Sequence, residues 1–166
     1  MSIPMIQLRN LVPDDLAAIR DWPPYPPEFK ELDYALRGNG WLDEYRSKPD
    51  TRCFAAMQAE ELVAFTILSK TGDAEAEFRI ALRGDRIGKG LGRAITAMTL
   101  ARGFTEIGLD RIYLIVRKDN PRAMRLYRRL GFVEHGECVK NVNGKQVHFL
   151  IMELRKESYS PEGAGV

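Results

Sequence analysis

Short apolar stretches, some alternating with polar residues, predict β-strands along much of the chain. They lie at residues 5–11, 52–58, 62–70, 76–82 and 111–116. The second and third flank the turn "AEE", which is typical of an antiparallel hairpin. Three successive strands therefore precede the most glycine-rich segment of the chain.

A helical period follows that glycine-rich segment. Leu91, Ala94, Ile95 and Met98 have the i, i+3, i+4, i+7 spacing of one helix face. The pattern predicts a helix over residues 91–107. Gly108 is placed to end this helix in a left-handed conformation.

The stretch "DNPRAMRLYRRLGF" predicts a second, shorter helix with clear boundaries. Asn120 is a good N-cap, Pro121 suits the first helical position, and Gly131 suits the position just past the end. Residues 132–140 and 147–154 then predict a closing hairpin across "NVNGKQ", which contains an Asn-Gly turn signal.

Prolines punctuate the N-terminal third. Pro13, Asp14 and Asp15 suit a helix start, and the prolines of "WPPYPP" must end that helix. A further helical stretch is expected from about Glu28 through "EFKELDYAL". The segment "RGNG" should break it before "WLDEYRS" forms another turn or two.

Length and composition indicate one cytoplasmic domain. A chain of 166 residues with 45% hydrophobic and 29% charged residues fits one globular unit, which we place at residues 1–156 with a flexible tail at 157–166. No apolar run approaches the roughly 20 residues of a membrane span, and the first residues do not form a signal peptide. The net charge of +2 does not suggest nucleic acid as a partner.

Metal and thiol chemistry find little support in the sequence. Cys53 and Cys138 lie far apart without CxxC spacing, so we expect buried reduced thiols, although a catalytic cysteine stays open. His135 and His148 are the two histidines, too few for a histidine-rich metal site. No metal is therefore expected.

Charged residues are unevenly distributed. Residues 21–50 are rich in acids, whereas residues 111–130 are rich in bases with Asp119 as their one acid. Such runs are commonly solvated faces. They also fit an anion bound near one end of a site and a cation bound near the other.

The segment "RIGKGLGRA" at residues 86–94 suits a pyrophosphate. Closely spaced glycines between a strand and a helix let backbone N–H groups approach an anion, and the helix dipole favours negative charge there. A P-loop is excluded because Gly90 follows Lys89 where Ser or Thr is needed. A Rossmann fingerprint is excluded because three strands precede the G-x-G-x-G pattern.

Two motifs together resemble the GNAT family of N-acetyltransferases. Gly90 and Gly92 match the family's coenzyme A loop, Gln/Arg-x-x-Gly-x-Gly/Ala, although Ile87 stands at its Gln/Arg position. "NPRAMRLYRRLGF" is similar to the family's Asn-x-x-Ala-x-x-Leu-Tyr-x-x-x-Gly-Phe segment. The resemblance runs from about Ala74 to Leu154. It implies an α/β (α+β) acyl-CoA N-acyltransferase fold, with a mixed, mostly antiparallel sheet of six or seven strands and helices on both faces.

The same resemblance implies which residues bind and react. The donor would be acetyl-CoA and the acceptor a primary amine on a small molecule or peptide. Tyr127 would be the general acid and Glu77 the base, with Glu75 or a water chain as other routes for the amine's proton. Residues implied to contact the cofactor are Ile80, Ala81, Leu82, Gly88, Lys89, Gly90, Leu91, Gly92, Arg93 and Asn120, with Arg122, Arg125 or Arg128 near its 3′-phosphate.

Structural roles compete with these functional ones. Asn120 is an N-cap whether or not it binds a ligand, and Tyr127 could be a core tyrosine. A non-catalytic acyl-CoA sensor and a transferase of longer acyl chains both stay open, as does a homodimer. The aromatics and acids of residues 21–45 suggest that a few of them bind a cationic amine, although most could simply bury two helices.

Overall fold

The computed structural model describes residues 5–28, 41–142 and 144–160. Seven strands form one sheet in the order β1-β2-β3-β4-β5-β7-β6. Their bounds are β1 Ile6–Asn10, β2 Thr51–Gln58, β3 Glu61–Gly72, β4 Glu75–Leu82, β5 Arg111–Arg117, β6 Val133–Val142 and β7 Lys145–Arg155. The helices are α1 Pro13–Arg20, α2 Trp41–Arg46, α3 Leu91–Ala101 and α4 Pro121–Arg129, with short 3₁₀ turns at Gly84–Arg86 and Lys156–Ser158.

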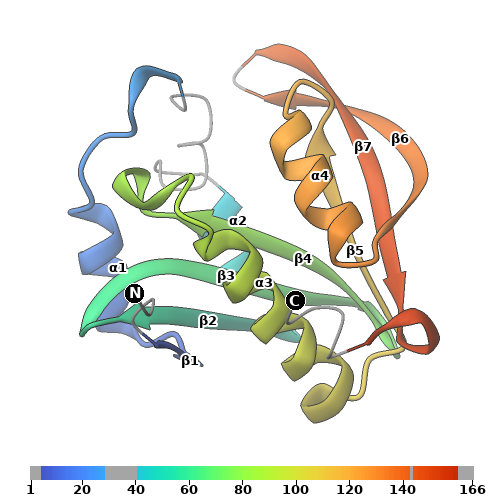
Figure 1. The fold of residues 1–166 in the computed structure, drawn as a ribbon, viewed down its shortest axis with the longest axis horizontal. Helices are drawn as coiled ribbons and strands as arrows, with labels where there is room; N and C mark the ends of the chain where they lie inside the picture. Colours follow the sequence, from blue (N-terminus) through green and yellow to red (C-terminus); the bar gives the residue numbers. More distant parts are fainter. Residues whose placement is uncertain (1–4, 29–40, 143, 161–166) are drawn as a thin grey trace.

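The pairing of β4 with β5 is parallel and short, whereas all the other strand pairs are antiparallel. It consists of Glu75–Arg111, Ala76–Ile112 and Glu77–Tyr113. Both strands continue beyond this point, β4 to Leu82 and β5 to Arg117, and they diverge as Figure 1 shows. The sheet is therefore forked, and the edge of β4 that faces β5 has no strand partner after Glu77 among the described residues.

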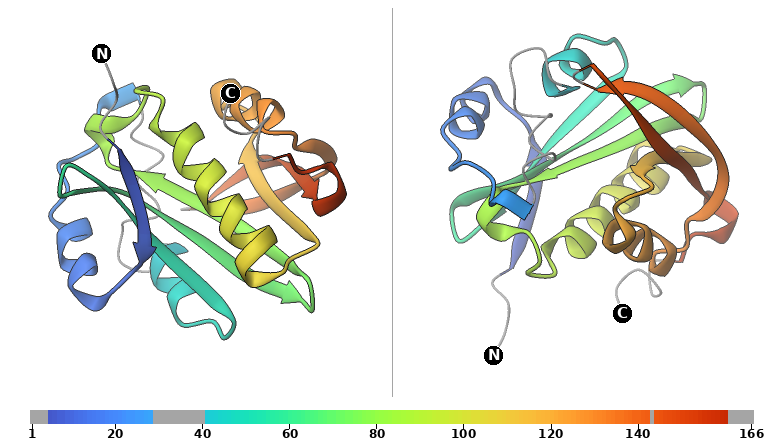
Figure 2. Two further views of the ribbon diagram at one scale, coloured as in Figure 1. Left: turned by 60° about the horizontal axis from the view of Figure 1, so that its bottom comes forward. Right: turned by 90° about the horizontal axis from the view of Figure 1, so that it is seen from above.

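Helices cover both faces of the sheet, as the sequence predicts (Figure 2). One core cluster joins α3 to the sheet and continues under α4, with Ile95, Phe104 and Met152 among its buried members. The other face of β2, β3 and β4 packs against α1 and α2 through Ile19, Leu42 and neighbouring residues. The two cores place α4 and α2 on opposite faces near the fork.

The helix expected over residues 91–107 is α-helical only to Ala101. Residues Arg102–Ile107 form a π-helical segment, and Gly108 ends it with the left-handed φ of 83° that the sequence predicts. Gly103 lies against the sheet in this segment, where an added Cβ would stand 2.8 Å from Ile112 Cδ1. The wider turn therefore accompanies an unusually close approach of helix and sheet.

Two other expectations concern residues near the limits of the described chain. The helix expected from about Glu28 through residue 36 lies almost wholly outside the described residues. The segment expected as a flexible tail begins with packed residues, because the Tyr159 ring lies against the Phe104 ring with 4.8 Å between their centroids. Packing thus extends past residue 156, where the sequence placed the end of the domain; the domain boundary stays a prediction.

Candidate active site

The glycine-rich segment forms an open, left-handed entry to α3. Gly88 has φ 83°, and Gly90, the N-cap of α3, has φ 81°. In the part of the chain that the structure describes, no atom beyond the adjacent residues lies within 4 Å of a Cβ added at Gly90. Among the described residues, no side chain caps the first turn of α3, so the first backbone N–H groups of this helix have no capping side chain.

Gly92 serves a different purpose in the same segment. A Cβ there would stand 3.4 Å from Leu126 Cδ1 of α4 and 3.6 Å from Leu82 Cδ1 of β4. The absence of a side chain at Gly92 thus brings α3, α4 and the end of β4 together. The buried Leu91 anchors the start of α3, whereas Lys89 is exposed.

Arginines approach this helix entry from two sides. The Arg93 Nε atom is buried and has no hydrogen-bond partner among the described residues. Arg122 reaches over from α4, with Nη1 3.6 Å from the position of a Cβ at Gly88. Arg86 is less available, because it binds Glu61 and the Gln58 side chain.

Much of the basic run at residues 111–130 is neutralised locally. Arg117 pairs with Asp119, Lys118 with Glu137, and Arg128 with Glu134. Nearby acids therefore balance much of the positive charge of this basic run. Arg122 belongs to this basic run and lies near the glycine segment.

The end of β4 lies beside the glycine segment. Ile80 and Leu82 pack toward α3, whereas Ala81 belongs to the α1 and α2 core. Tyr25 donates its hydroxyl to the Leu82 carbonyl oxygen at 2.5 Å. A residue of the proline-rich segment thus touches the strand end that the sequence assigned to the cofactor, a contact across 57 positions that no local pattern indicates.

Tyr127 lies in an aromatic cluster on α4. Its ring makes edge contacts with Phe78, at 6.4 Å between centroids, and with Phe132, at 5.7 Å. Burial raises the pKa of Tyr127 to about 12, and the positive charge of Arg79 opposes this shift. The half-buried ring satisfies the structural role that the sequence allowed.

Asn120 caps α4 as the sequence predicts. Its Oδ1 atom accepts a hydrogen bond from the Ala123 backbone N–H at 3.2 Å. The side chain is half-buried and lies about two helical turns from Tyr127 along α4. Cap formation alone accounts for this residue, so a contact with the cofactor stays a prediction.

Glu77 belongs to a buried network that the sequence did not indicate. Tyr45 of α2 donates its hydroxyl to Glu77 Oε1 at 2.6 Å, and Arg79 Nη2 lies 3.2 Å from Glu77 Oε2. The Arg79 guanidinium also stands 5.2 Å from the centre of the Tyr45 ring. Desolvation raises the pKa of Tyr45, so its hydroxyl stays a donor. The period of two along β4 could have indicated Arg79; nothing local indicated Tyr45.

The aromatics of residues 21–45 have structural contacts where they are described. Trp22 stacks on Phe65 at 6.0 Å, and Tyr45 is buried against Glu77 and Arg79. Phe29, Tyr34 and the Trp41 side chain lie outside the described residues. Cys53 and Cys138 are half-buried free thiols.

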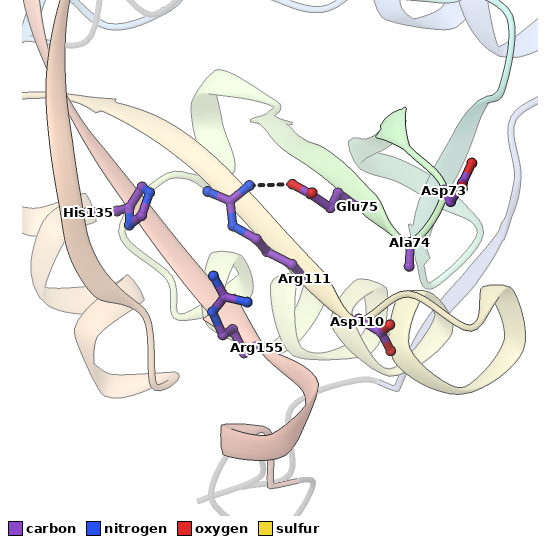
Figure 3. Close-up of a pocket in the computed structure, with 7 residues that line it drawn as sticks. All are labelled: Asp73, Ala74, Glu75, Asp110, Arg111, His135 and Arg155. Carbon is purple, nitrogen blue, oxygen red and sulfur yellow. Dashed lines mark hydrogen bonds and ion pairs between the residues drawn. The ribbon is translucent and has the colours of Figure 1, made fainter.

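A surface cavity of about 600 Å³ lies at the paired end of β4 and β5, away from the glycine segment (Figure 3). Its lining includes Glu75, Arg111, His135 and Arg155, and none of the residues assigned to the cofactor.

Within the described ranges, no group of three or more side chains is arranged to hold a metal ion. In the same ranges, no helix is long and apolar enough to cross a membrane.

Comparison with known proteins identifies a family and several relatives. A model described as the acetyltransferase (GNAT) family matches residues 16–132. Spermidine N(1)-acetyltransferase of Escherichia coli (strain K12) is 35% identical over 89 residues, which are 52% of this chain and 48% of that protein. Mycothiol acetyltransferase of Parafrankia sp. is 32% identical over 129 residues, 76% of this chain and 38% of that protein. The alignments thus span about half or less of these curated relatives.

Solved structures match over more of the chain. The crystal structure of spermidine N-acetyltransferase from Vibrio cholerae in complex with CoA and spermine superposes with a TM-score of 0.76. The two sequences are 26% identical, and the match covers 93% of this chain and 97% of the other. The sheet and helix arrangement expected from the sequence is therefore confirmed.

Proposed function

Because the chain belongs to the GNAT family of acetyltransferases, we propose that it transfers the acetyl group of acetyl-CoA directly to a primary amine of a small molecule or peptide. The fork in the sheet carries this proposal. β4 and β5 stop pairing after Glu77 and Tyr113, and the free segment of β4 leads to the open entry to α3. A long donor could lie along the free edge of β4 with its pyrophosphate at the glycines.

The described residues fit such a donor. From Ile80 to Leu82, the backbone groups that face β5 have no strand partner. Apart from the Leu82 carbonyl oxygen, which accepts the Tyr25 hydroxyl, they can bind the amides of the pantetheine arm. The pyrophosphate would meet the first-turn N–H groups of α3 and the unpartnered Arg93 Nε. Gly90 leaves room for that approach, and Arg122 can add charge from α4.

The donor supplies an activated acyl group in the form of a thioester. In the transfer the amine nitrogen bonds to the acyl carbon while the carbon–sulfur bond breaks. The amine must first lose a proton, because its ordinary pKa is about 10.4, and the sulfur must gain one, because a thiol has a pKa of about 8.5. Glu77 would accept the first proton, directly or through water, and Tyr127 would donate the second.

The acceptor would approach from the side of the sheet covered by α1 and α2. Glu77 faces this side through its bond to Tyr45, whereas Tyr127 packs on the α3 side through Phe78. The two candidate groups thus flank the fork from opposite faces. Relatives named for spermidine support an amine acceptor that is cationic before it reacts.

A non-catalytic acyl-CoA sensor is the second candidate. The packing of Tyr127 between Phe78 and Phe132 favours it, because this packing explains the tyrosine without any chemistry. Both candidates require donor binding at the glycine segment. Turnover separates them, since a sensor would bind acetyl-CoA and release no thiol when amines are added.

The test combines calorimetric binding of acetyl-CoA with a thiol-release assay against polyamines, amino acids, aminoglycosides and peptide amino termini. Gly90→Glu should abolish binding by placing bulk and negative charge at the pyrophosphate. Gly144→Glu is the matched control, because Gly144 has φ 82° and equally open surroundings in the β6–β7 turn. Unchanged affinity in a folded Gly90→Glu variant would contradict the assignment.

A further inference from the structure

Charged residues gather on one face of β4, β5 and β7, next to the fork. Period two places Glu75, Glu77 and Arg79 on the same face of β4 as Ala81, which packs toward α1 and α2. Register extends this face across the sheet, because Glu75 is level with Arg111 and Arg155, and Glu77 with Tyr113 and Glu153. We call it the fork face; it comprises Glu75, Glu77, Arg79, Arg111, Tyr113, Glu153 and Arg155.

Each of the three carboxylates of the fork face is paired with an arginine of the same face. Glu75 Oε2 lies 2.7 Å from Arg111 Nη1, as Figure 3 shows. Glu153 binds Arg111 Nε at 3.1 Å and Arg155 Nε at 2.9 Å, and His135 Nδ1 lies 2.9 Å from its Oε1 atom.

The third pair, Glu77 with Arg79, lies closest to the chemistry. Arg79 is two residues beyond the last β4–β5 pair, on the free segment of β4. The side chains of Arg79 and Glu77 are 18% and 11% exposed. Water therefore screens this pair poorly, and Arg79 is also fixed over the Tyr45 ring.

This pairing matters for the choice of acceptor. A polyamine has ammonium groups besides the one that reacts, and each binds best to a carboxylate that no other cation neutralises. The fork face presents its carboxylates already neutralised. An additional ammonium near Glu77 would meet the Arg79 guanidinium at close range, which is a like-charge contact.

We propose that Arg79 is a specificity-determining residue: by pairing with Glu77 it removes the negative charge that would attract a polyamine, so that the enzyme favours acceptors with a single amine. This inference rests on the proposed acetyl transfer. It makes the acceptor of this chain different from spermidine, after which several of its relatives are named.

A graded series of acceptors tests the proposal. Butylamine, putrescine and spermidine all present a primary aminobutyl group, but they carry one, two and three amines. The wild type should show no rise in kcat/KM along this series. In Arg79→Gln, the ratio of spermidine to butylamine should rise about tenfold, the gain expected for one newly available charge-assisted contact. The change should appear in the KM of the acceptor, with the KM of acetyl-CoA unchanged.

Two variants control for loss of structure and of general charge. Arg79→Lys keeps the positive charge and should keep the wild-type ratio. Arg155→Gln removes a charge from the exposed end of the fork face, where Arg111 and His135 still hold Glu153, and should also leave the ratio unchanged. A merely structural role for Arg79 would lower activity with all three amines equally.

Two results would overturn the proposal. One is a wild-type kcat/KM that rises tenfold or more from butylamine to spermidine, a result that needs no variant. The other is an unchanged spermidine Kd in Arg79→Gln, measured by calorimetry with CoA present. The Kd comparison decides the question even without turnover, whereas absence of turnover with every amine would instead contradict the proposed acetyl transfer.

Discussion

Burial and the Arg79 guanidinium shift the pKa of the Tyr127 hydroxyl in opposite directions. Desolvation raises its pKa to about 12, and the charge of Arg79 lowers it. A thiolate released into the same poorly hydrated space would have its own pKa raised by the same desolvation. The difference that governs proton transfer is thus between two raised pKa values, so burial alone does not disqualify Tyr127 as the acid.

Replacing Tyr127 by Phe should leave acetyl-CoA affinity nearly intact while lowering turnover. The change removes a proton donor and little packing, and general acid catalysis contributes roughly 10²–10⁴-fold. Steady-state kinetics with separate kcat and KM values measure this. Tyr159→Phe is the control, because Tyr159 also packs on an aromatic ring and has a raised pKa. Equal turnover in both variants would make Tyr127 a core residue.

Tyr127 should also make stability depend on alkaline pH. The unfolded state loses the phenolic proton near pH 10, whereas the folded state keeps it to about pH 12. The stabilisation that the raised pKa of Tyr127 contributes is therefore fully present below pH 10, and it is lost between pH 10 and 12. At pH 11 the free energy of unfolding should have dropped by about 1 kcal/mol more in the wild type than in Tyr127→Phe. Denaturant titrations at pH 8 and 11 measure this difference, and equal drops would contradict it.

At the scale of elements, local sequence determined many of the helix and strand boundaries. Strand periodicity, the Asn120 cap and the left-handed Gly108 and Gly131 were all predictable, because each depends on neighbouring residues. The π-helical segment was not, because it accompanies the contact of Gly103 with Ile112 across the core. Contacts of the site itself, such as Tyr45 with Glu77, join distant positions and leave no local pattern.

Gly103→Ala tests the close approach of the π-helical segment to the sheet. The new Cβ would stand 2.8 Å from Ile112 Cδ1 and 3.2 Å from Leu68 Cδ1. Overpacking typically costs about 1–3 kcal/mol, and the better helix propensity of Ala returns about 1 kcal/mol, so we expect a net loss of about 1 kcal/mol. Thermal or denaturant unfolding measures it.

Gly136→Ala is the matched control for that substitution. The nearest atom to its added Cβ is Ile151 Cδ1 at 3.8 Å, an ordinary contact. This variant should unfold within about 0.5 kcal/mol of the wild type. If Gly103→Ala were as stable as Gly136→Ala, the π-helical segment would have room that the structure does not indicate.

At the scale of the whole molecule, the fork separates two parts that follow one another along the chain. Strands β1 to β4 and α3 precede Gly108, whereas β5, α4, β6 and β7 follow it. The backbone joins the two parts through the register pairs of Glu75–Glu77 with Arg111–Tyr113. The two parts also share an apolar core, which includes Leu100 and Phe104 from the first part and Ile112 and Leu154 from the second.

This arrangement makes the protein a candidate for division into two chains. Gly108 is exposed, and no atom of the described residues beyond its chain neighbours lies within 4 Å of its Cβ position, so this residue itself makes little packing contact. Fragments 1–108 and 109–166, produced in the same cells, should reassemble through their complementary apolar surfaces and copurify on a tag carried by one of them. Acetyl-CoA lying across the fork would hold both fragments, so it should tighten their association by mass action. Association of the two polypeptides would then depend on the concentration of a metabolite, which is the principle of a split reporter.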